Sequence, residues 1–351
     1  IWLGGLATGD VEFSAEAIIQ VEASDGATVE TVGMSDARVG ATYAPTDFVA
    51  ATAMAAANGA TVITFPRESR ANATVRISGD GGAAAAHLVI IAEPFSEATV
   101  VVDHEGEGVF AGNIEIRVEA GARLTFASLQ DWHRSTVHVG QHNAAIGRDA
   151  VLRMAHVTLG GDLVRISPSV TYLDRGGDAE LLGVFFAGSG QHLEHRVFVE
   201  HDQPNCRSSV LYKGALDGDG SHTVWIGDVL VRANAVGIDT YEVNRNLLLS
   251  DGARADSVPN LELETGEIVG AGHASATGRF DDEQLFYLQS RGIPEDVARL
   301  LVVRGFFADV LGRLGLPELQ TRVMSTVDER LGVDLKAIGL VDTGLAKDEV
   351  G

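Results

Sequence analysis

The segment from Gly190 to Cys206 contains side chains that could bind a transition metal, namely His192, His195, His201 and Cys206 itself. Imidazole nitrogen and thiolate sulfur are ligands that zinc and iron accept. On a β-strand, however, His195 and His201 share one face and lie about 20 Å apart, too far to share one ion. The three-residue step from His192 to His195 suits a helix or loop better than a strand. We therefore expect these side chains to be structural.

Two groups of carboxylates are further candidates for chemistry. Asp281, Asp282 and Glu283 are adjacent, but they stand at the start of a helical pattern, where capping explains them better than acid-base catalysis. Asp217 and Asp219, in LDGDGSH, resemble the beginning of a calcium loop. The later acidic ligands of such a loop are missing, so this segment is expected to be a turn.

His273 stands alone among small residues in the segment GAGHASATG. A lone histidine is by default structural or solvated, although its small neighbours leave the imidazole accessible to a ligand or to another chain. The sequence contains no GxxxxGK[ST] motif for nucleotide phosphates and no GxSxG elbow for a nucleophilic serine. Nucleophilic hydrolysis therefore has no support from the sequence, and any step driven by ATP must come from another chain.

The composition excludes several classes of partner. Twenty-six basic residues against 49 acidic ones give a formal net charge of −23, which disfavours binding to nucleic acid and to anionic membranes. The single cysteine excludes an intrachain disulfide and is compatible with a reducing compartment, so we expect a cytoplasmic protein. No apolar run approaches the roughly 20 residues that span a bilayer. Because the chain begins with Ile rather than Met, we expect further sequence upstream.

Between about residues 60 and 270 the sequence consists of short β-rich runs separated by Gly and Asp. The turn-then-strand phrase recurs in GARLTFASL, RDAVLRMAHV and GDAELLGVFF, where Ala122, Ala150 and Ala179 return at a nearly constant interval. This interval is typical of one coil of a solenoid. The pattern predicts a parallel β-helix with one antiparallel insertion, and residues 217–220 are a candidate hairpin turn. A jelly roll or other sandwich is the alternative.

Helical patterns flank the β-rich region. The run DFVAATAMAAANG, after Pro45 and Thr46, predicts one helix that stops at Asn58-Gly59. From Asp281 onward the apolar spacing becomes helical, with a capping box formed by Asp281 and Gln284 and a stop at Gly292. Further helices are expected to begin near Pro294 and near Pro317.

These patterns divide the chain into four parts. We expect a mixed amino-terminal segment, a β-helix core, a carboxy-terminal helical domain and a tail, at residues 1–60, 61–278, 279–340 and 341–351. Phe286, Tyr287, Phe306 and Phe307 give the helical domain more aromatic surface than so short a bundle can hide. Docking against a partner or against the end of the solenoid is therefore expected.

Three phrases carry a resemblance to a known family: NRNLLLSDGARADSVPNLE, PNCRSSVLYKGALDGDGSHTVWIGDVLV and DDEQLFYLQSRGIPEDVARLLVVRGFF. The chain resembles the SufB/SufD family of iron-sulfur cluster assembly proteins over about residues 190–315. The resemblance implies a right-handed parallel β-helix followed by a helical domain. It implies a non-catalytic scaffold that works with a SufB-like paralogue, paired through the terminal β-helix coils, and with the ABC-type ATPase SufC.

The resemblance also implies which residues act. His273 matches a histidine associated with a nascent cluster at the interface between the two paralogues, so it is expected to ligate a transient iron-sulfur cluster or iron; no cofactor is expected to stay bound to the isolated chain. Docking of SufC is expected to involve the helical domain, through Phe286, Tyr287, Ser290, Arg291, Gly292, Phe306 and Phe307.

Two positions distinguish the paralogues, and a third departs from the SufD-like pattern. SufB-like proteins carry a functional cysteine where Leu263 stands and a glutamate where Ala274 stands, so the chain is similar to SufD. A cysteine often found two residues before the histidine is replaced by Ala271. Three alternatives remain open: a SufB-like paralogue, a β-helix enzyme acting on polysaccharide, and a self-associating structural β-helix that forms homodimers.

Overall fold

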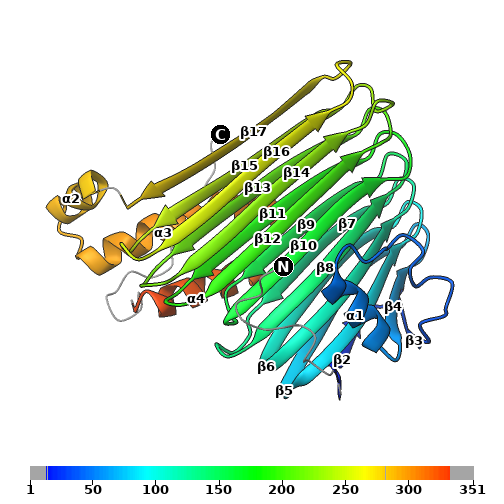
Figure 1. Cartoon of the computed structure of the whole chain (residues 1–351), viewed down its shortest axis with the longest axis horizontal. Helices are drawn as coiled ribbons and strands as arrows, with labels where there is room; N and C mark the ends of the chain where they lie inside the picture. Colours follow the sequence, from blue (N-terminus) through cyan, green and yellow to red (C-terminus); the bar gives the residue numbers. More distant parts are fainter. Residues whose placement is uncertain (1–12, 14, 281, 333–351) are drawn as a thin grey trace, which may run out of the picture. The chain divides into compact units, whose positions relative to one another are not determined.

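The computed structural model describes residues 13, 15–280 and 282–332. The chain forms two compact units that divide between Gly278 and Arg279, and they are described separately. The first unit is a parallel β-solenoid of about eight turns, whose strands run side by side in Figure 1. The predicted mainly-β fold with a parallel solenoid and carboxy-terminal helices is confirmed, and the sandwich is rejected.

The strands of the solenoid make two sheets that share the long strands β5 (Arg70–Ala92) and β6 (Glu97–Val118). The first sheet continues from the early halves of β5 and β6 and also contains β2 (Ile18–Ala23), β7 (Arg123–Gln130), β9 (Val151–Thr158), β11 (Asp178–Ala187), β13 (Arg207–Leu216), β15 (Asp239–Leu248) and β17 (Gly270–Arg279).

The second sheet continues from the later halves of the same two strands. Its other members are β1 (Ala15–Glu16), β3 (Thr28–Val32), β4 (Ala60–Phe65), β8 (Val137–Ile146), β10 (Leu163–Tyr172), β12 (His192–His201), β14 (His222–Val231) and β16 (Arg254–Leu263). From β7 onward, successive strands of the chain alternate between the two sheets, so each coil contributes one strand to each.

The alanine repeat predicts the solenoid correctly, although the three alanines do not all occupy equivalent places. Val151 pairs with Arg123, so Ala122 and Ala150 are equivalent and lie directly before their strands. Asp178 pairs with Val151, and Ala179 therefore lies opposite Leu152, two positions beyond Ala150. The loops between strands vary in length, and this variation moves the register while all three alanines remain buried.

The predicted hairpin at residues 217–220 is wrong. This segment connects β13 to β14, but β13 pairs in parallel with β11 and β15, and β14 pairs with β12 and β16. Gly218 and Gly220 have φ of 91° and 69°, a left-handed conformation that lets the chain turn from one sheet to the other. Antiparallel pairs occur instead near the amino terminus, between β2 and β5 and between β3 and β4.

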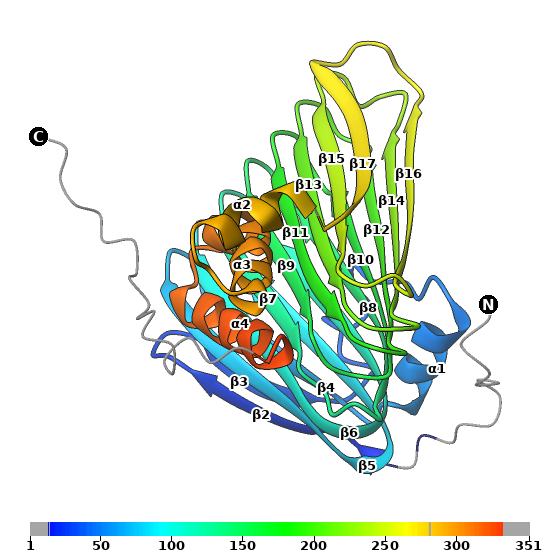
Figure 2. The same ribbon diagram turned by 90° about the vertical axis from the view of Figure 1, so that its left-hand side faces the viewer.

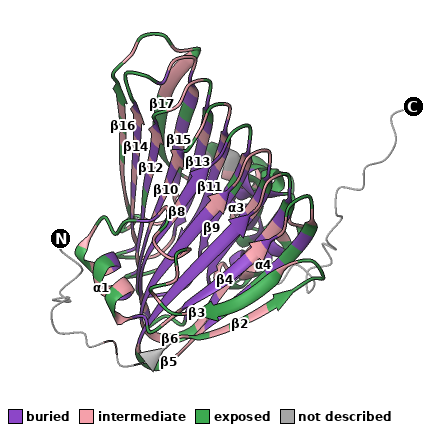
Figure 3. Ribbon diagram, turned by 90° about the vertical axis from the view of Figure 1, so that its right-hand side faces the viewer, coloured by how far each residue is buried: buried purple, intermediate pink, exposed green. Residues whose placement is uncertain are grey.

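The core lies between the two sheets. Side chains alternate along each strand, and on β12 the inward positions are His195, Val197, Val199 and His201, all buried. Figure 3 shows the middle coils almost wholly buried, whereas β2, β16 and β17 are largely intermediate or exposed. The last coil of the solenoid therefore leaves inward-facing side chains accessible.

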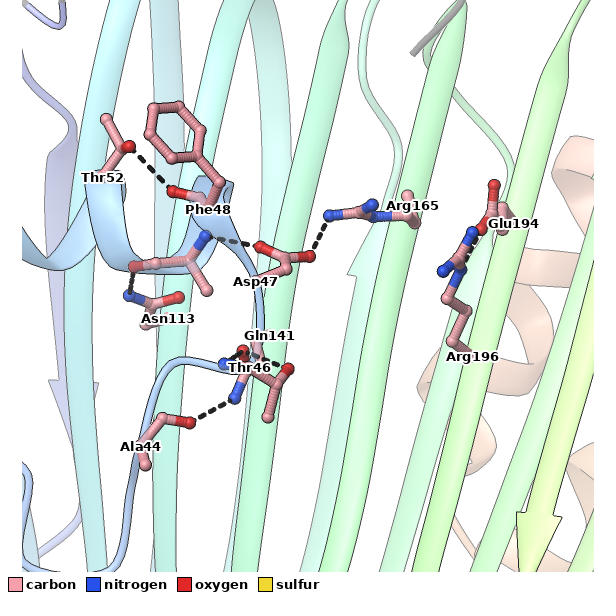
Figure 4. Close-up of polar contacts among 11 residues, drawn as sticks. Ala44, Thr46, Asp47, Phe48, Thr52, Asn113, Gln141, Arg165, Glu194 and Arg196 are labelled. Atoms are coloured by element: carbon pink, nitrogen blue, oxygen red, sulfur yellow. Dashed lines mark hydrogen bonds and ion pairs between the residues drawn. The ribbon is translucent and has the colours of Figure 1, made fainter. Parts of the chain in front are cut away.

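The predicted amino-terminal helix is confirmed as α1 (Phe48–Ala56), which packs against β5, β6 and β8 of the second sheet. Asp47 caps it by accepting a hydrogen bond from the Ala50 N–H at 2.8 Å, and its other carboxylate oxygen contacts the buried guanidinium of Arg165. Gln141 accepts from the Thr46 N–H at 2.9 Å. Figure 4 shows these polar side chains fixing α1 to the sheet.

The second unit consists of α2 (Asp282–Ser290), α3 (Glu295–Leu314) and α4 (Pro317–Arg330), which Figure 2 labels individually. The predicted stop at Gly292 and the helix starts after Pro294 and at Pro317 are confirmed. Arg304 of α3 and Asp328 of α4 form an ion pair at 2.7 Å. The predicted capping box falls on Asp281 and on the Gln284 side chain, which lie outside the described part. None of the described helices is long and apolar enough to cross a membrane.

Candidate functional site

His273 lies on β17, the last strand of the first sheet, beside β15. The two strands approach closely at Gly272, where a Cβ atom would lie 2.7 Å from the ring of Tyr241. Nδ1 of His273 is 3.7 Å from Oε1 of Glu242, an inward-facing residue of β15. The imidazole therefore faces the space between the sheets. Because this is the last coil, 42% of the His273 side chain remains exposed.

Glu242 is a buried carboxylate without a hydrogen-bond donor. Its side chain is fully buried, and neither carboxylate oxygen has a hydrogen-bond partner among the described residues. Burial raises the pKa of Glu242 to about 8, and the negative charge of Asp228 adds to the increase. A Cβ atom on Gly227 would lie 2.5 Å from Oε2 of Glu242, so glycine at that position leaves room for the carboxylate.

Several other inward side chains of the last coil are polar and linked to one another. Ser275 donates a hydrogen bond to Ser257 at 2.7 Å, and Ser257 donates to Asn244 at 2.8 Å, which connects β17, β16 and β15. Asn246 donates to Oδ1 of Asn244 at 2.7 Å and contacts Thr277 at 3.3 Å. Polar side chains thus enter the interior at this coil, beside apolar ones of β16 that still pack against the core.

A cleft of about 510 Å³ borders His273 and is lined in part by Asp228, Asn260 and Glu262. Its walls come from β12, β14, β16 and β17. The charged lining residues are acidic, and Asp228 accepts a hydrogen bond from Asn260 at 2.6 Å. The cleft gives a ligand or another chain access to the imidazole.

The interior of the middle coils contains histidines that the sequence patterns did not single out. His142 and His156 are hydrogen-bonded at 3.0 Å, and His156 contacts the Tyr212 hydroxyl at 3.3 Å. Burial lowers the pKa of His104 to about 4, and it lowers the pKa values of His142 and His156 well below the usual range. These imidazoles are neutral at physiological pH. Strict alternation along each strand is the signal that could have placed them inside.

The predicted separation of His192, His195, His201 and Cys206 agrees with their positions. His195 and His201 are buried and face inward, and Cys206 is buried with the pKa of its thiol raised by burial. His192 faces outward, where its Nδ1 lies 3.1 Å from Nδ1 of His222. Within residues 13, 15–280 and 282–332, no three His, Cys, Asp or Glu side chains are grouped so as to hold a metal ion.

Comparison with known proteins identifies the family. The model of the SufBD core domain of the SUF iron-sulfur cluster assembly system matches residues 75–306. The chain belongs to the SufBD family. It is 52% identical to the iron-sulfur cluster assembly SufBD family protein Rv1462 of Mycobacterium tuberculosis over 341 residues, covering 94% of this chain and 86% of that protein.

Mycobacterium leprae contains two relatives that differ in similarity. The SufBD family protein ML0594 is 50% identical over 341 residues, which cover 94% of this chain and 87% of that protein. The SufBD family protein ML0593 is 27% identical over 211 residues, which cover 60% of this chain and 24% of that protein. One organism therefore carries two SufBD proteins, and this chain is much more similar to one of them.

Because the SufBD family takes part in iron-sulfur cluster assembly, iron is the ion whose ligand preferences matter at His273. His273 offers an accessible imidazole nitrogen, a ligand that iron accepts. Glu242 adds an oxygen ligand without a hydrogen-bond partner. Two such ligands fit part of an iron site. A cluster held mainly by thiolates needs further ligands, and the described residues contain no group of three His, Cys, Asp or Glu side chains that could supply them.

The helical residues expected to bind a partner differ in accessibility. Phe286 and Tyr287 of α2 are 72% and 56% exposed, and Arg291 lies over the Tyr287 ring at 4.9 Å. Ser290, Arg291 and Gly292 are also exposed, and Phe306 is partly buried. Phe307, in contrast, is fully buried in the helical unit because it shares the inward face of α3 with Val303 and Val310. Phe307 is therefore removed from the expected contact surface.

Proposed function

We propose that this SufBD protein is a SufD-like, non-catalytic scaffold subunit that acts in the cytoplasm with a SufB-like paralogue and the SufC ATPase. One observation carries the proposal: an accessible histidine stands at the open last coil, where the described residues provide too few ligands for a cluster of their own. A site shared between two chains resolves this shortage. The cluster is then a transient cargo rather than a resident cofactor.

The edges of the last coil support pairing with a second solenoid. β16 and β17 are the last strands of their sheets, and every residue of both strands is intermediate or exposed. Val258, Leu263 and Val269 are exposed apolar side chains at this end. An exposed strand edge readily pairs with another strand, so a SufB-like chain can extend both sheets across the interface. The two SufBD relatives in M. leprae support a pair of unlike subunits.

The choice of the SufD-like branch depends on the residues at two positions. Leu263 lies at the end of β16 and Ala274 follows His273 on β17, and neither side chain can ligate iron. The SufB-like alternative would require cysteine and glutamate there. Exposed Phe286 and Tyr287 support docking of the ATPase on α2.

Anaerobic co-expression with SufB-like and SufC-like proteins tests the proposal. We expect a stable three-component complex, and we expect His273→Ala to lower its iron and sulfide content without dissociating it, because the substitution removes a ligand and leaves the strand edges intact. A Phe286→Ala/Tyr287→Ala variant should lose the ATPase but retain the paralogue. Phe48→Ala, an exposed aromatic of α1, is the matched control. Failure to form any complex, or formation of homodimers alone, contradicts the proposal.

A further inference from the structure

We propose that Glu242 and His273 together bind one divalent first-row cation between Oε1 and Nδ1. This inference rests on the proposed function for the identity of the cation. If the chain acts in cluster assembly, the cation is ferrous iron that is later incorporated into a cluster. The pair forms half of a coordination sphere, and water or a facing chain supplies the rest. Glu242 is thereby the second ligand of this chain at a site where the sequence indicated only His273.

The separation of the two atoms is suited to coordination. At 3.7 Å, Nδ1 of His273 and Oε1 of Glu242 are too far apart for a hydrogen bond. Imidazole nitrogen and carboxylate oxygen bind such cations at about 2.0–2.2 Å. A cation at about 2.1 Å from each atom gives an angle of about 120° at the metal, and a shortening of the separation by about 0.3 Å would make it tetrahedral. The pair therefore accepts a cation with little movement of either side chain.

The environment of Glu242 also favours a cation. Both of its oxygens are buried without a hydrogen-bond donor, although buried carboxylates are ordinarily paired. Asp228 adds negative charge, and it lines the cleft beside His273 together with a second acidic residue, Glu262. A bound cation neutralises the carboxylate and engages the imidazole at once.

A second histidine-carboxylate pair shows what a structural pair looks like in the same solenoid. His87 and Glu115 are both buried and lie 2.6 Å apart, within hydrogen-bond distance. The same oxygen of Glu115 also accepts a hydrogen bond from the Gly40 N–H at 2.7 Å. That pair is closed and inaccessible, whereas in the pair at Glu242 the imidazole of His273 borders the cleft and the hydrogen bond is missing.

Titration of the full chain with Co²⁺, and anaerobically with Fe²⁺, tests the inference without any partner. Calorimetry gives the affinity, and the visible absorption of Co²⁺ reports its ligands. We expect wild-type protein to bind one Co²⁺ per chain, and we expect Glu242→Gln and His273→Ala each to weaken binding by about tenfold or more and to alter the spectrum. Glu267→Gln, which removes an exposed carboxylate from the loop between β16 and β17, is the charge-matched control and should leave binding unchanged.

The combined variant separates a shared site from two independent effects. If both residues ligate the same ion, the loss of binding free energy in Glu242→Gln/His273→Ala should be smaller than the sum of the two single losses, whereas independent effects should add. The inference is overturned if Glu242→Gln retains wild-type affinity and spectrum, if Glu267→Gln weakens binding equally, or if wild-type protein binds no Co²⁺. A chain that binds Co²⁺ through this pair but forms no complex with SUF proteins would contradict the proposed function and leave the cation pair standing.

Discussion

At the scale of single residues, His273 differs from the histidines of the middle coils in what surrounds it. His142 and His156 are hydrogen-bonded to each other inside a closed core. His273 faces the carboxylate of Glu242 without a hydrogen bond and remains accessible. The same residue type is thus a packing element in one coil and a candidate ligand in the last one, and the difference arises because no further coil covers it.

Substitution of Gly227 would test how tightly the side chains around Glu242 are packed. A Cβ atom there would lie 2.3 Å from the indole of Trp225 and 2.5 Å from Oε2 of Glu242. We expect Gly227→Ala to displace one of these side chains and to destabilise the solenoid by about 1–3 kcal/mol. Urea unfolding followed by tryptophan fluorescence measures the change. Gly278→Ala, where nothing lies within 4 Å of the added atom, should unfold like wild type; equal stability of the two variants would contradict the packing argument.

The sequence indicated His273 through a family resemblance, but it did not indicate Glu242. Alternation along TYEVNRN places Glu242 and Asn244 on one face, which could be recognised from the strand alone. Which inward residue lies beside Glu242 depends on the register with a strand of the next coil. That register is set by the lengths of the loops between strands. Loop length is also the reason why Ala179 pairs with Leu152 and not with Ala150.

At the scale of elements, repeated strand phrases were sufficient to predict a solenoid, because each coil needs an apolar inward face and a turn. They were not sufficient to predict the connections. The Asp-Gly turn at residues 217–220 has the composition of a hairpin, yet parallel pairing with neighbouring coils overrides the local preference. The polar contacts that hold α1 against the sheet could not be predicted either, because Asp47 and Arg165 are 118 positions apart in the sequence.

The contact between Asp47 and Arg165 yields a prediction for α1. Asp47 both caps the helix and provides a carboxylate for a guanidinium that is almost wholly buried. Asp47→Asn keeps a good capping residue but leaves the charge of Arg165 unpaired, so we expect a loss of about 3–5 kcal/mol, as for other broken buried pairs. Asp47→Ala should cost about 1 kcal/mol more because the cap is lost as well.

Thermal and urea unfolding of the two Asp47 variants measure these losses. Thr52→Ala, which removes only an exposed hydrogen bond to the Phe48 carbonyl within α1, is the helix control and should change stability little. If Asp47→Asn is as stable as wild type, the contact with Arg165 contributes nothing and α1 is held by its apolar contacts alone.

At the scale of the whole molecule, the buried histidines couple the stability of the solenoid to pH. Burial lowers the folded-state pKa of His195 to about 3 and those of His104 and His201 to about 4. Unfolded histidine titrates near 6.5. Between these values the unfolded chain binds more protons than the folded chain, so the stability present above pH 6.5 is lost as the pH falls towards the folded pKa values.

Replacement of one buried histidine should therefore flatten the pH dependence. Each buried imidazole costs up to about 1.4 kcal/mol of stability per pH unit below 6.5, or about 2 kcal/mol at pH 5.

We expect His195→Gln to be less stable than wild type at pH 7.5, because packing against Phe185 and the contact with Thr158 are disturbed. Its further loss of stability on acidification from pH 7.5 to pH 5 should be smaller than that of wild type by about 2 kcal/mol, because one proton-binding group is absent from the unfolded chain. Urea unfolding at each pH measures the difference. Parallel pH profiles for the two proteins would show that His195 takes up its proton without unfolding, and acid sensitivity would then have to come from the carboxylates instead.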